Sequence, residues 1–374
     1  MIKVLHFFKT YYPDTMGGIE QVICQLAEGG IEEGIESEVL YLSARGAARD
    51  ERYKHHRTHR VNLDLNVAST GMSLSALKRF VQLARQADVI HYHFPWPFMD
   101  IIHFLARLKK PTVVTYHSDI VKQKTLLALY SPLMHKFLSS VDVIVASSPN
   151  YVASSSVLAR FAEKVKVIPF GLDRTAFSKV NAARSEYWRD RLGGRFFLFV
   201  GALRYYKGLE FLVEAAALTS CQIVIAGGGP QEETLKARVE ELNLSNVKFV
   251  GLVSDDDKDT LLELCTGFVF PSHLRSEAFG ISLLEGAMYA KPMISCEIGT
   301  GTSYINIDGE TGYVVRPENP NDLAKAMDRL WSDSSLCDQL GKNALARAEQ
   351  YFGVREMVKS YSDIYKSLVS QTHS

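Results

Sequence analysis

Short β-branched runs alternate with segments of helical periodicity along the first half of the chain. Each run precedes or follows an amphipathic stretch, which is the pattern of βαβ units in a parallel sheet. We therefore predict an α/β domain whose strands are IKVLHFF (2–8), SEVLYLS (37–43), DVIHYHF (88–94), PTVVTYH (111–117), DVIVASS (142–148) and KVKVIP (164–169).

The same pattern restarts after a polar segment, DRTAFSKVNAARSEYWRDRLGG (173–194), which has no strand pattern and which we interpret as a linker. We predict two Rossmann-like parallel-sheet domains, residues 1–180 and 181–352, that face each other across a cleft. The last helix, 353–374, has no strand to pair with and is predicted to pack back on the first domain. The predicted strands of the second domain are RFFLFVGAL (195–203), CQIVIAGGGP (221–230), NVKFVG (246–251), GFVFPS (267–272) and PMISC (292–296).

A chain of 374 residues with 47% hydrophobic and 22% charged residues is typical of a globular protein with two cores. No apolar run approaches the roughly 18 residues needed to span a bilayer, and the start, MIKVLHFF, is too short for a signal peptide. We expect a cytoplasmic protein. The cysteines have no metal-site or redox spacing, so we expect free, buried thiols at Cys24, Cys221, Cys265, Cys296 and Cys337.

The net charge of zero conceals an asymmetry between the two halves. Residues 1–180 hold 22 basic against 16 acidic residues, whereas residues 181–374 hold 20 against 26. The basic excess is concentrated in residues 51–140, which also contain eight of the eleven histidines. This stretch is either a solvated face or a surface that meets anionic lipid or a phosphate-bearing acceptor. It has no basic motif interleaved with aromatic residues, so nucleic acid is not an expected partner.

Two glutamates flank a Phe-Gly pair in SEAFGISLLEGAMYAKP (276–292), directly after a predicted strand. A helix that begins near residue 280 leaves Glu277 in the loop and Glu285 in the second turn. A carboxylate on each side of a helix start suits a ligand that is anionic in its middle and hydroxylated at both ends, such as a nucleotide-diphosphate-sugar. The alternative is that Glu277 caps the helix and Glu285 lies on the surface. The anion site itself is predicted at the amides of Ala278, Phe279, Gly280 and Ile281.

Two cations follow the first strand of the second half, in VGALRYYKGLEFLVEAA. Arg204 and Lys207 lie just past the strand end and near a helix start, where they can neutralise a diphosphate without a metal. Exposed surface cations are the alternative. The next strand ends in a Gly-Gly-Gly-Pro turn (227–230), which on its own is weak evidence for phosphate binding.

In the first half, Gly17 and Gly18 stand immediately before a helix, where glycines let the backbone approach a ligand closely. A simple turn is the alternative. The strand PTVVTYH ends at His117, and a histidine there can donate to a sugar hydroxyl or stabilise developing charge. A satisfied core or loop histidine is the alternative for His117. His91 and His93 share one face of their strand and are assigned packing or acceptor-side roles.

Two patterns are similar to metal sites but are interpreted otherwise. The acidic triplet Asp255–Asp257 follows a serine and precedes a helix, so we interpret it as a charged helix N-terminus. The stretch KHHRTHR, with His55, His56 and His59, lacks supporting Cys or acid spacing, so we interpret it as a solvated loop. We therefore predict no metal ligands.

Taken together, these residues resemble those of the family 4 glycosyltransferases, which are retaining enzymes of the GT-B architecture, over essentially the whole chain. The resemblance rests on the Gly17-Gly18 loop, TYH (115–117), IPFGLD (168–173), RYYKG (204–208), the GGGP turn and the E-x7-E motif of Glu277 and Glu285.

The family resemblance implies roles for the candidate residues. Glu285 is expected to bind ribose hydroxyls and Glu277 the hydroxyls of the donor sugar. Arg204 and Lys207 are expected to bind the diphosphate, and His117 to contact the sugar near the reacting carbon. The resemblance also implies no essential metal and no cofactor beside the nucleotide-sugar donor.

The opening HFFKTYYPDTMGGIEQVICQLAEGG (6–30) further resembles bacterial O-antigen mannosyltransferases and their rhamnosyl-transferring relatives. This resemblance implies transfer of mannose from GDP-mannose to a lipid-linked saccharide at the cytoplasmic face of the inner membrane. Peripheral contact with anionic lipid is then expected through LARLKKP (105–111) and VKQKTLLALYSPLMHKFLSS (121–140).

Three alternatives to this function remain open. They are a UDP-sugar donor, a small soluble acceptor, and a sugar-nucleotide-binding protein without turnover. A dinucleotide-dependent oxidoreductase is not favoured, because GxGxxG is absent after the first strand of either half.

Overall fold

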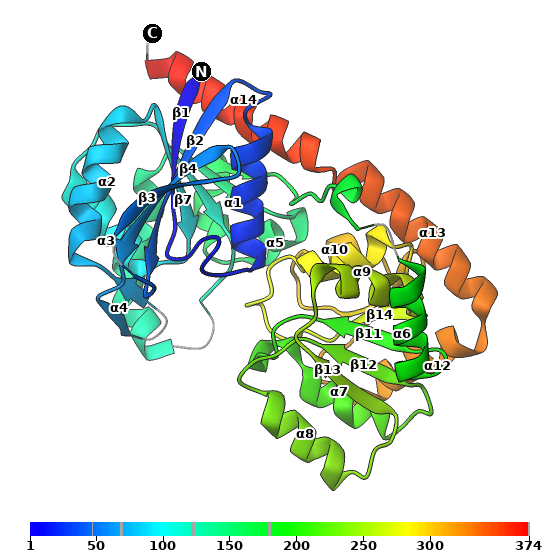
Figure 1. The fold of residues 1–374 in the computed structure, drawn as a ribbon. Coiled ribbons are helices and arrows are strands. Elements are labelled where there is room, and N and C mark those ends of the chain that lie inside the picture. Colours follow the sequence, from blue (N-terminus) through cyan, green and yellow to red (C-terminus); the bar gives the residue numbers. More distant parts are fainter. Residues whose placement is uncertain (47, 68–69, 121–123, 179–180, 373–374) are drawn as a thin grey trace. The chain divides into compact units, whose positions relative to one another are not determined.

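The computed structural model describes residues 1–374 except 47, 68–69, 121–123, 179–180 and 373–374 (Figure 1). The chain forms two compact units: the first comprises Met1–Gly171 and Val354–Ser374, and the second comprises Leu172–Gly353. The predicted boundary lies after residue 180 instead. Leu172 already belongs to the second unit, because its amide donates to the Phe352 carbonyl at 2.9 Å and it forms a β-bridge with Gly353.

The first unit is built on an eight-stranded sheet of order β10-β9-β8-β7-β1-β2-β4-β3, parallel except for the edge strand β3. Every residue of β7 and β8 is buried, as expected for central strands covered on both faces. The six predicted strands are all present, whereas β3 to β6 were not predicted. The strands are β1 (Ile2–Phe7), β2 (Ile35–Ser43), β3 (Arg49–Tyr53), β4 (His56–Asn62), β7 (Val89–Phe94), β8 (Thr112–Tyr116), β9 (Val143–Ala146) and β10 (Val165–Val167), with a separate hairpin of β5 (Leu65–Val67) and β6 (Thr70–Met72).

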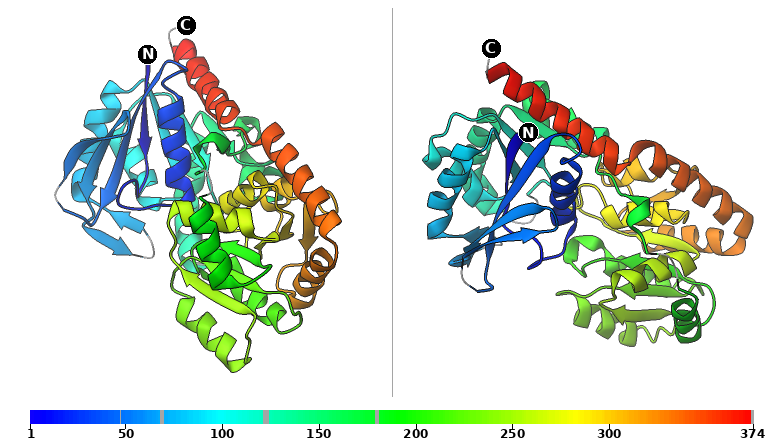
Figure 2. Two further views of the ribbon diagram at one scale, coloured as in Figure 1. Left: turned by 45° about the vertical axis from the view of Figure 1, so that its right-hand side comes forward. Right: turned by 45° about the horizontal axis from the view of Figure 1, so that its top comes forward.

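The C-terminal helix α14 (Val354–Thr372) packs against α1 (Gly18–Gly29) in the first unit, and all views show the two side by side (Figures 1 and 2). A Cβ on Gly29 would lie 2.7 Å from Cγ2 of Val358, so the glycine permits the close approach. Lys366 adds an ion pair with Glu33 at 3.1 Å. The other helices of the unit are α2 (Leu74–Gln86), α3 (Pro97–Ala106), α4 (Lys124–Ser140), α5 (Pro149–Ser154) and η1 (Leu158–Lys164).

The second unit is built on a six-stranded parallel sheet of order β13-β12-β11-β14-β15-β16. Its strands are β11 (Phe197–Val200), β12 (Ile223–Ala226), β13 (Val247–Gly251), β14 (Gly267–Phe270), β15 (Met293–Cys296) and β16 (Gly312–Val315). The five predicted strands are present, and β16 was not predicted. Its helices are η2 (Arg174–Ala176), α6 (Ala182–Leu192), η3 (Tyr205–Lys207), α7 (Leu209–Ala216), α8 (Glu232–Glu241), α9 (Asp255–Leu264), α10 (Ile281–Met288), α11 (Thr302–Ile305), α12 (Pro320–Ser332) and α13 (Ser334–Tyr351).

The predicted linker 173–194 is wrong for most of its length, because it contains η2 and helix α6 of the second unit. Asn181 caps α6 by accepting from the amide of Ala183 at 2.9 Å. The buried Trp188 donates its indole N–H to Asp257 of α9 at 3.0 Å. The polar composition of α6 concealed this packing, since only one face of the helix is buried.

The interpretation of KHHRTHR as a solvated loop is also wrong. His56 and His59 are buried in strand β4, whereas His55 lies in the exposed turn before it. Acids from other elements satisfy them: Glu28 of α1 contacts His56 at 2.5 Å, and Glu38 of β2 contacts His59 at 3.0 Å. These partners are distant in sequence, so local spacing could not reveal them.

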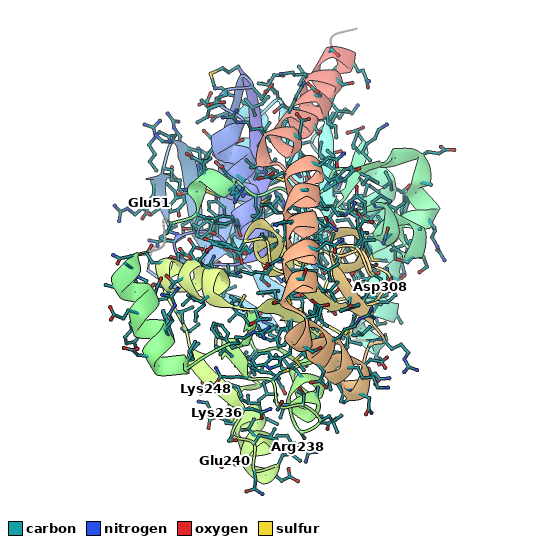
Figure 3. The ribbon with its side chains drawn as sticks, turned by 90° about the vertical axis from the view of Figure 1, so that its right-hand side faces the viewer. Glu51, Lys236, Arg238, Glu240, Lys248 and Asp308 are labelled. Atoms are coloured by element: carbon teal, nitrogen blue, oxygen red, sulfur yellow. The ribbon has the colours of Figure 1, made fainter. Side chains whose placement is uncertain are left out.

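The surface of the second unit is solvated and charged where α8 lies (Figure 3). Lys236 pairs with Glu232 at 2.8 Å, and Arg238 pairs with Glu241 at 2.8 Å.

The five cysteines are free and buried, as predicted. Within the described residues, none of the helices combines the length and hydrophobicity that crossing a membrane requires.

Candidate active site

Three loops at the carboxyl ends of β11, β12 and β14 pack closely in the second unit. The glycine turn after β12 is required by this packing: a Cβ on Gly227 would lie 2.0 Å from the carbonyl oxygen of Gly201, and one on Gly229 would lie 2.7 Å from that of Leu203. The amide of Leu203 also donates to the Gly228 carbonyl at 3.0 Å. Gly227 and Gly229 of the GGGP turn therefore position the β11 loop, and this packing explains both glycines without a phosphate.

Gly208 brings the β11 loop against the β14 loop. Its φ is 64°, and a Cβ there would lie 2.1 Å from the carbonyl oxygen of Pro271, so a larger residue is excluded on both counts. The amide of His273 donates to the Tyr206 carbonyl at 3.1 Å. This contact holds Lys207, at the end of η3, beside the loop that carries Glu277.

Lys207 and Glu277 form a largely buried ion pair. Nζ of Lys207 lies 2.5 Å from Oε2 of Glu277, and the side chains are 11% and 13% exposed. Ser272 donates to the same carboxylate oxygen at 3.3 Å. The ammonium also lies over the ring of Phe270, 4.5 Å from its centroid, a cation–π contact that limits its movement. The structure thus brings together two residues that were predicted as site residues from two separate motifs.

Arg204 lies in the same loop, immediately before η3, and is exposed. Burial and the Glu277 charge raise the pKa of Tyr206, and the Arg204 charge opposes that rise. Arg204 therefore contributes positive potential next to the Lys207–Glu277 pair, from the solvent side.

Helix α10 begins at Ile281 with Gly280 as its N-cap (φ 97°), so Glu277 lies in the loop and Glu285 in the second turn, as predicted. The first-turn amides of an α-helix have no intrahelical acceptors and favour anions. Ala278 and Phe279 are buried, and the Ala278 carbonyl accepts from the amide of Gly301 at 2.8 Å. These contacts fix the loop that leads into the helix.

Glu285 is buried and paired with a residue that the sequence analysis missed. Nζ of Lys258, on α9, lies 2.8 Å from Oε1 of Glu285. Burial raises the pKa of Glu285, and the Lys258 charge opposes the rise. The predicted alternative of a surface Glu285 is therefore wrong. A possible signal was that Lys258 is the one basic residue in DDDKDTLLEL.

The acidic triplet forms the first turn of α9, as predicted. Ser254 caps the helix by accepting from the Asp257 amide at 3.1 Å. Arg184 contacts Asp257 at 2.7 Å and Asp256 at 3.3 Å. Two of the three carboxylates are thus used in holding α6 against α9.

In the first unit, His117 directly follows β8 and is 5% exposed. Burial lowers its pKa to about 3, so the imidazole is neutral at physiological pH. Its Nε2 lies 3.0 Å from Nδ1 of His93, while its ring contacts Phe8 and Phe170. A neutral imidazole can donate or accept one hydrogen bond at its remaining nitrogen, but it supplies no positive charge.

Gly17 is the N-cap of α1, and both Gly17 and Gly18 are exposed. The Glu20 carboxylate folds back over this helix start, with Oε2 2.7 Å from the position of a Cβ on Gly17. Thr15 donates to the other oxygen of Glu20 at 2.8 Å. The contact with Glu20 therefore explains the absence of a side chain at Gly17, in addition to the predicted approach of a ligand. The carboxylate of Glu20 already lies at the start of this helix.

A cavity of about 320 Å³ in the second unit includes none of the predicted residues. Asp308, labelled in Figure 3, is one of its lining residues. The full lining is Glu297, Ser303, Asn306, Ile307, Asp308 and Val314.

Comparison with known proteins agrees with the division of the chain into two units. Residues 16–176 match the family model "Glycosyltransferase Family 4", and residues 186–347 match "Glycosyl transferases group 1". A D-rhamnosyltransferase of Pseudomonas aeruginosa, WbpZ, is 56% identical over 94% of this chain and 92% of its own length. This chain belongs to the family 4 glycosyltransferases.

Another relative of this glycosyltransferase is O-antigen chain mannosyltransferase C of Escherichia coli, which is 50% identical over 98% of this chain and 99% of its own. Among solved structures, sucrose-phosphate synthase from Thermosynechococcus elongatus matches with a TM-score of 0.83 at 21% identity, covering 99% of this chain and 100% of the other. HepE of Anabaena, solved in complex with UDP and glucose, matches with a TM-score of 0.78 at 21% identity over 98% of this chain and 100% of its own. The fold is therefore GT-B, with two Rossmann-like domains, as predicted.

Proposed function

We propose that this glycosyltransferase transfers mannose from GDP-mannose, with retention at the anomeric carbon, to a lipid-linked saccharide in O-antigen biosynthesis. Two relatives with 56% and 50% identity are named as a D-rhamnosyltransferase and an O-antigen chain mannosyltransferase. D-Rhamnose is 6-deoxymannose, so both names refer to sugars of the manno configuration. The structural observation that carries the proposal is the Lys207–Glu277 pair next to the start of α10.

The donor binds along α10 in this proposal. The diphosphate lies at the amides of Ala278, Phe279, Gly280 and Ile281, where a helix N-terminus favours an anion. Arg204 and Lys207 supply the positive charge, Arg204 from an exposed position and Lys207 from a buried one. The carboxylates accept from hydroxyls at the two ends of the donor: Glu277 from the hexose and Glu285 from the ribose.

The same groups stabilise the departing diphosphate. As the anomeric bond loosens, negative charge grows on the leaving oxygen, and preorganised donors at such an oxygen are worth about 3 kcal/mol each. The acceptor oxygen bonds to the anomeric carbon on the face from which the diphosphate leaves, which gives retention. The anomeric C–O bond to the diphosphate breaks, and the hydroxyl proton passes to the departing phosphate oxygen. From the family resemblance, His117 and the Gly17-Gly18 backbone are assigned to the sugar, to which His117 offers a neutral hydrogen-bonding nitrogen. No metal or further cofactor takes part in this scheme.

A thermal-shift series with free GDP, UDP and ADP tests the donor, because a nucleotide that binds only the folded protein raises its melting temperature. We expect the largest shift with GDP. A larger shift with UDP would contradict a GDP-sugar donor and favour the UDP-sugar alternative. NMR of the product of GDP-mannose and a saccharide acceptor then reports the anomeric configuration, and inversion would contradict retention.

We also propose that the first unit contacts anionic lipid at the cytoplasmic face of the inner membrane. On α3, Ile101 and Leu105 are 42% and 59% exposed and lie one helical turn apart. On α4, Leu126 and Leu129 are 51% and 78% exposed with the same kind of spacing. The two helices are joined by the buried Asp100, to which Tyr130 donates.

Basic residues accompany these exposed leucines: Arg107 and Lys109 follow α3, and Lys136 lies over the ring of Phe104. Residues 121–123 of the predicted stretch lie outside the described residues. Flotation with vesicles containing anionic lipid tests the contact, and high salt should release the protein because it screens the lysines. Leu129→Glu should reduce flotation, whereas Leu218→Glu, at a leucine of 51% exposure in the second unit, should not. Equal flotation of the two variants would contradict the proposal that the exposed leucines of the first unit contact lipid.

A further inference from the structure

Three imidazoles and a hydroxyl form an unbroken hydrogen-bonded row that ends at His117. The row spans the four adjacent strands β8, β7, β1 and β2 of the first unit: His117 follows the first, and His93, His6 and Ser37 lie on the other three in that order. His6 and His93 are fully buried, and Ser37 of β2 is 4% exposed. His93 was predicted to have a packing or acceptor-side role, whereas no role was predicted for His6 or Ser37.

The contacts in the row join one nitrogen of each ring to the next. Nε2 of His6 lies 3.3 Å from Oγ of Ser37, and Nδ1 of His6 lies 3.1 Å from Nε2 of His93. Nδ1 of His93 in turn lies 3.0 Å from Nε2 of His117. The ring planes are nearly parallel along the row, with interplanar angles of 21° and 23°, which is compatible with N–H···N contacts.

Burial keeps each imidazole in the row neutral. It lowers the pKa of His6 and of His117 to about 3, and that of His93 well below its usual value. A neutral imidazole has one N–H donor and one acceptor nitrogen. A ring that accepts at one nitrogen must therefore donate at the other, so the direction of every bond in the row is set by one end.

Ser37 sets that direction. Among the described residues, the hydroxyl of Ser37 has no hydrogen-bond partner other than His6, and a buried O–H that does not donate is costly. If Ser37 donates to Nε2 of His6, then His6 and His93 each donate from Nδ1. His117 then accepts at Nε2 and carries its proton on Nδ1.

His91 is held outside the row although it stacks on His93 at 4.3 Å. Its Nδ1 lies 2.7 Å from the hydroxyl of Tyr365, and its Nε2 lies 2.7 Å from Oγ1 of Thr115. Tyr361, also on α14, contacts Thr115 at 2.9 Å. The second set of bonds occupies both nitrogens of His91 and leaves His93 to bond only along the row.

We propose that Ser37, His6 and His93 are positioning residues that hold His117 as the Nδ1–H tautomer, so that it presents a hydrogen-bond donor to the sugar. The contact between His117 and the sugar rests on the proposed function, whereas the histidine tautomers can be measured without a nucleotide-sugar. A competing use of the cluster is a metal site, since ligand atoms of His6, His91 and His93 all lie within 4.8 Å of one another.

Long-range ¹H–¹⁵N correlation spectra of the ¹⁵N-histidine-labelled full chain test the row directly. We expect Nδ1–H signatures at His6, His93 and His117. A mixture of tautomers among these three residues, or Nε2–H throughout, would overturn the proposal. Addition of Zn²⁺ should leave the three signatures unchanged, and their replacement by metal-bound signatures would overturn it in favour of a metal site.

The variant Ser37→Ala tests whether the row affects catalysis. We expect it to change the tautomer signature of His117 and to lower kcat about fivefold, the equivalent of one neutral hydrogen bond. Ser37→Thr, which keeps the hydroxyl, should restore both. Ser43→Ala is the matched control, because Ser43 is also buried on β2 but bonds the Arg45 carbonyl. If Ser37→Ala and Ser43→Ala have the same effects, the row does not act on His117. Failure of GDP to bind would contradict the proposed donor but not the tautomers.

Discussion

Nζ of Lys207 lies 2.5 Å from Oε2 of Glu277, although the two residues are 70 positions apart in the sequence. If the pair works as a unit on the donor, Lys207→Ala and Glu277→Ala should each lower kcat/KM by about 10²- to 10³-fold. The double variant should be little worse than either single variant. Initial rates with a saturating acceptor measure this, with Lys236→Ala on the surface of α8 as the control. Fully additive losses would show that the two side chains act independently.

Because Lys258 and Glu285 form a buried pair, we predict that substitutions there affect the unfolding free energy and GDP affinity differently. Lys258→Met leaves a buried carboxylate without its partner, so it should cost about 3–5 kcal/mol of unfolding free energy. The double variant Lys258→Met/Glu285→Gln should recover most of that loss in urea unfolding. Because Glu285 is assigned to the ribose, the double variant should still bind GDP about tenfold more weakly in calorimetric titration. Wild-type affinity in the double variant would remove Glu285 from the donor site.

Asp257 predicts a pH dependence of stability. Burial acts to raise its pKa, but hydrogen bonds from Ser254, Arg184 and Trp188 lower it to about 2. Since the folded-state pKa is below the usual value of 3.8, the contribution is complete above about pH 4 and is lost as the pH falls through about 2. Asp257→Asn should therefore cost about 1 kcal/mol at pH 7. The difference from the wild type should disappear near pH 2 in thermal unfolding, and a constant difference would contradict this account.

Removal of divalent metal should leave transfer unchanged. Arg184 contacts two carboxylates of the acidic triplet, and the proposed diphosphate ligands are side-chain cations and amides. Dialysis against EDTA is expected to keep the initial rate within about twofold, a change of less than half a kcal/mol. A loss of activity that Mn²⁺ or Mg²⁺ restores would show that the side-chain cations and amides do not neutralise the diphosphate without a metal ion.

Gly208→Ala should be more damaging than alanine at another glycine of positive φ in the same unit. Gly208 has a φ of 64° and Gly309 a φ of 70°, a region that costs alanine about 1–2 kcal/mol. A Cβ on Gly208 would lie 2.1 Å from the Pro271 oxygen, whereas a Cβ on Gly309 meets nothing within 4 Å. Gly208→Ala should therefore lower the melting temperature further than Gly309→Ala and also reduce transfer, because Lys207 moves. Equal effects would show that the loop contact is dispensable.

The central strands were predictable because they are buried on both faces. Runs such as VIHYHF and TVVTY are almost entirely β-branched or aromatic, and the structure buries all of their residues. Among the strands that were missed, β3 and β4 are rich in charged residues and histidines, and the burial of His56 and His59 on β4 depends on acids contributed by α1 and β2. Helix α6 was missed for a similar reason, since its residues are largely polar and only Ser185, Trp188 and Leu192 are buried.

The candidate site was predictable where it depends on strand ends and helix starts. Gly280 marked the start of α10, so the loop position of Glu277 and the helical position of Glu285 followed from local sequence. The partners were not predictable: Lys258 and Glu285 are 27 positions apart, and Ser37 and His6 are 31 positions apart. Such pairs arise from strand order and loop packing, which no local pattern contains.

The tyrosines of α14 that bond Thr115 and His91 are separated from them in the chain by the whole second unit. During translation, the β7 and β8 segments therefore leave the ribosome long before Tyr361 and Tyr365 are synthesised. Until then, the polar atoms of His91 and Thr115 have no phenolic partners, while the second unit already has all of its residues. Co-translational folding should accordingly finish in the reverse of sequence order, with the first unit closing after the second.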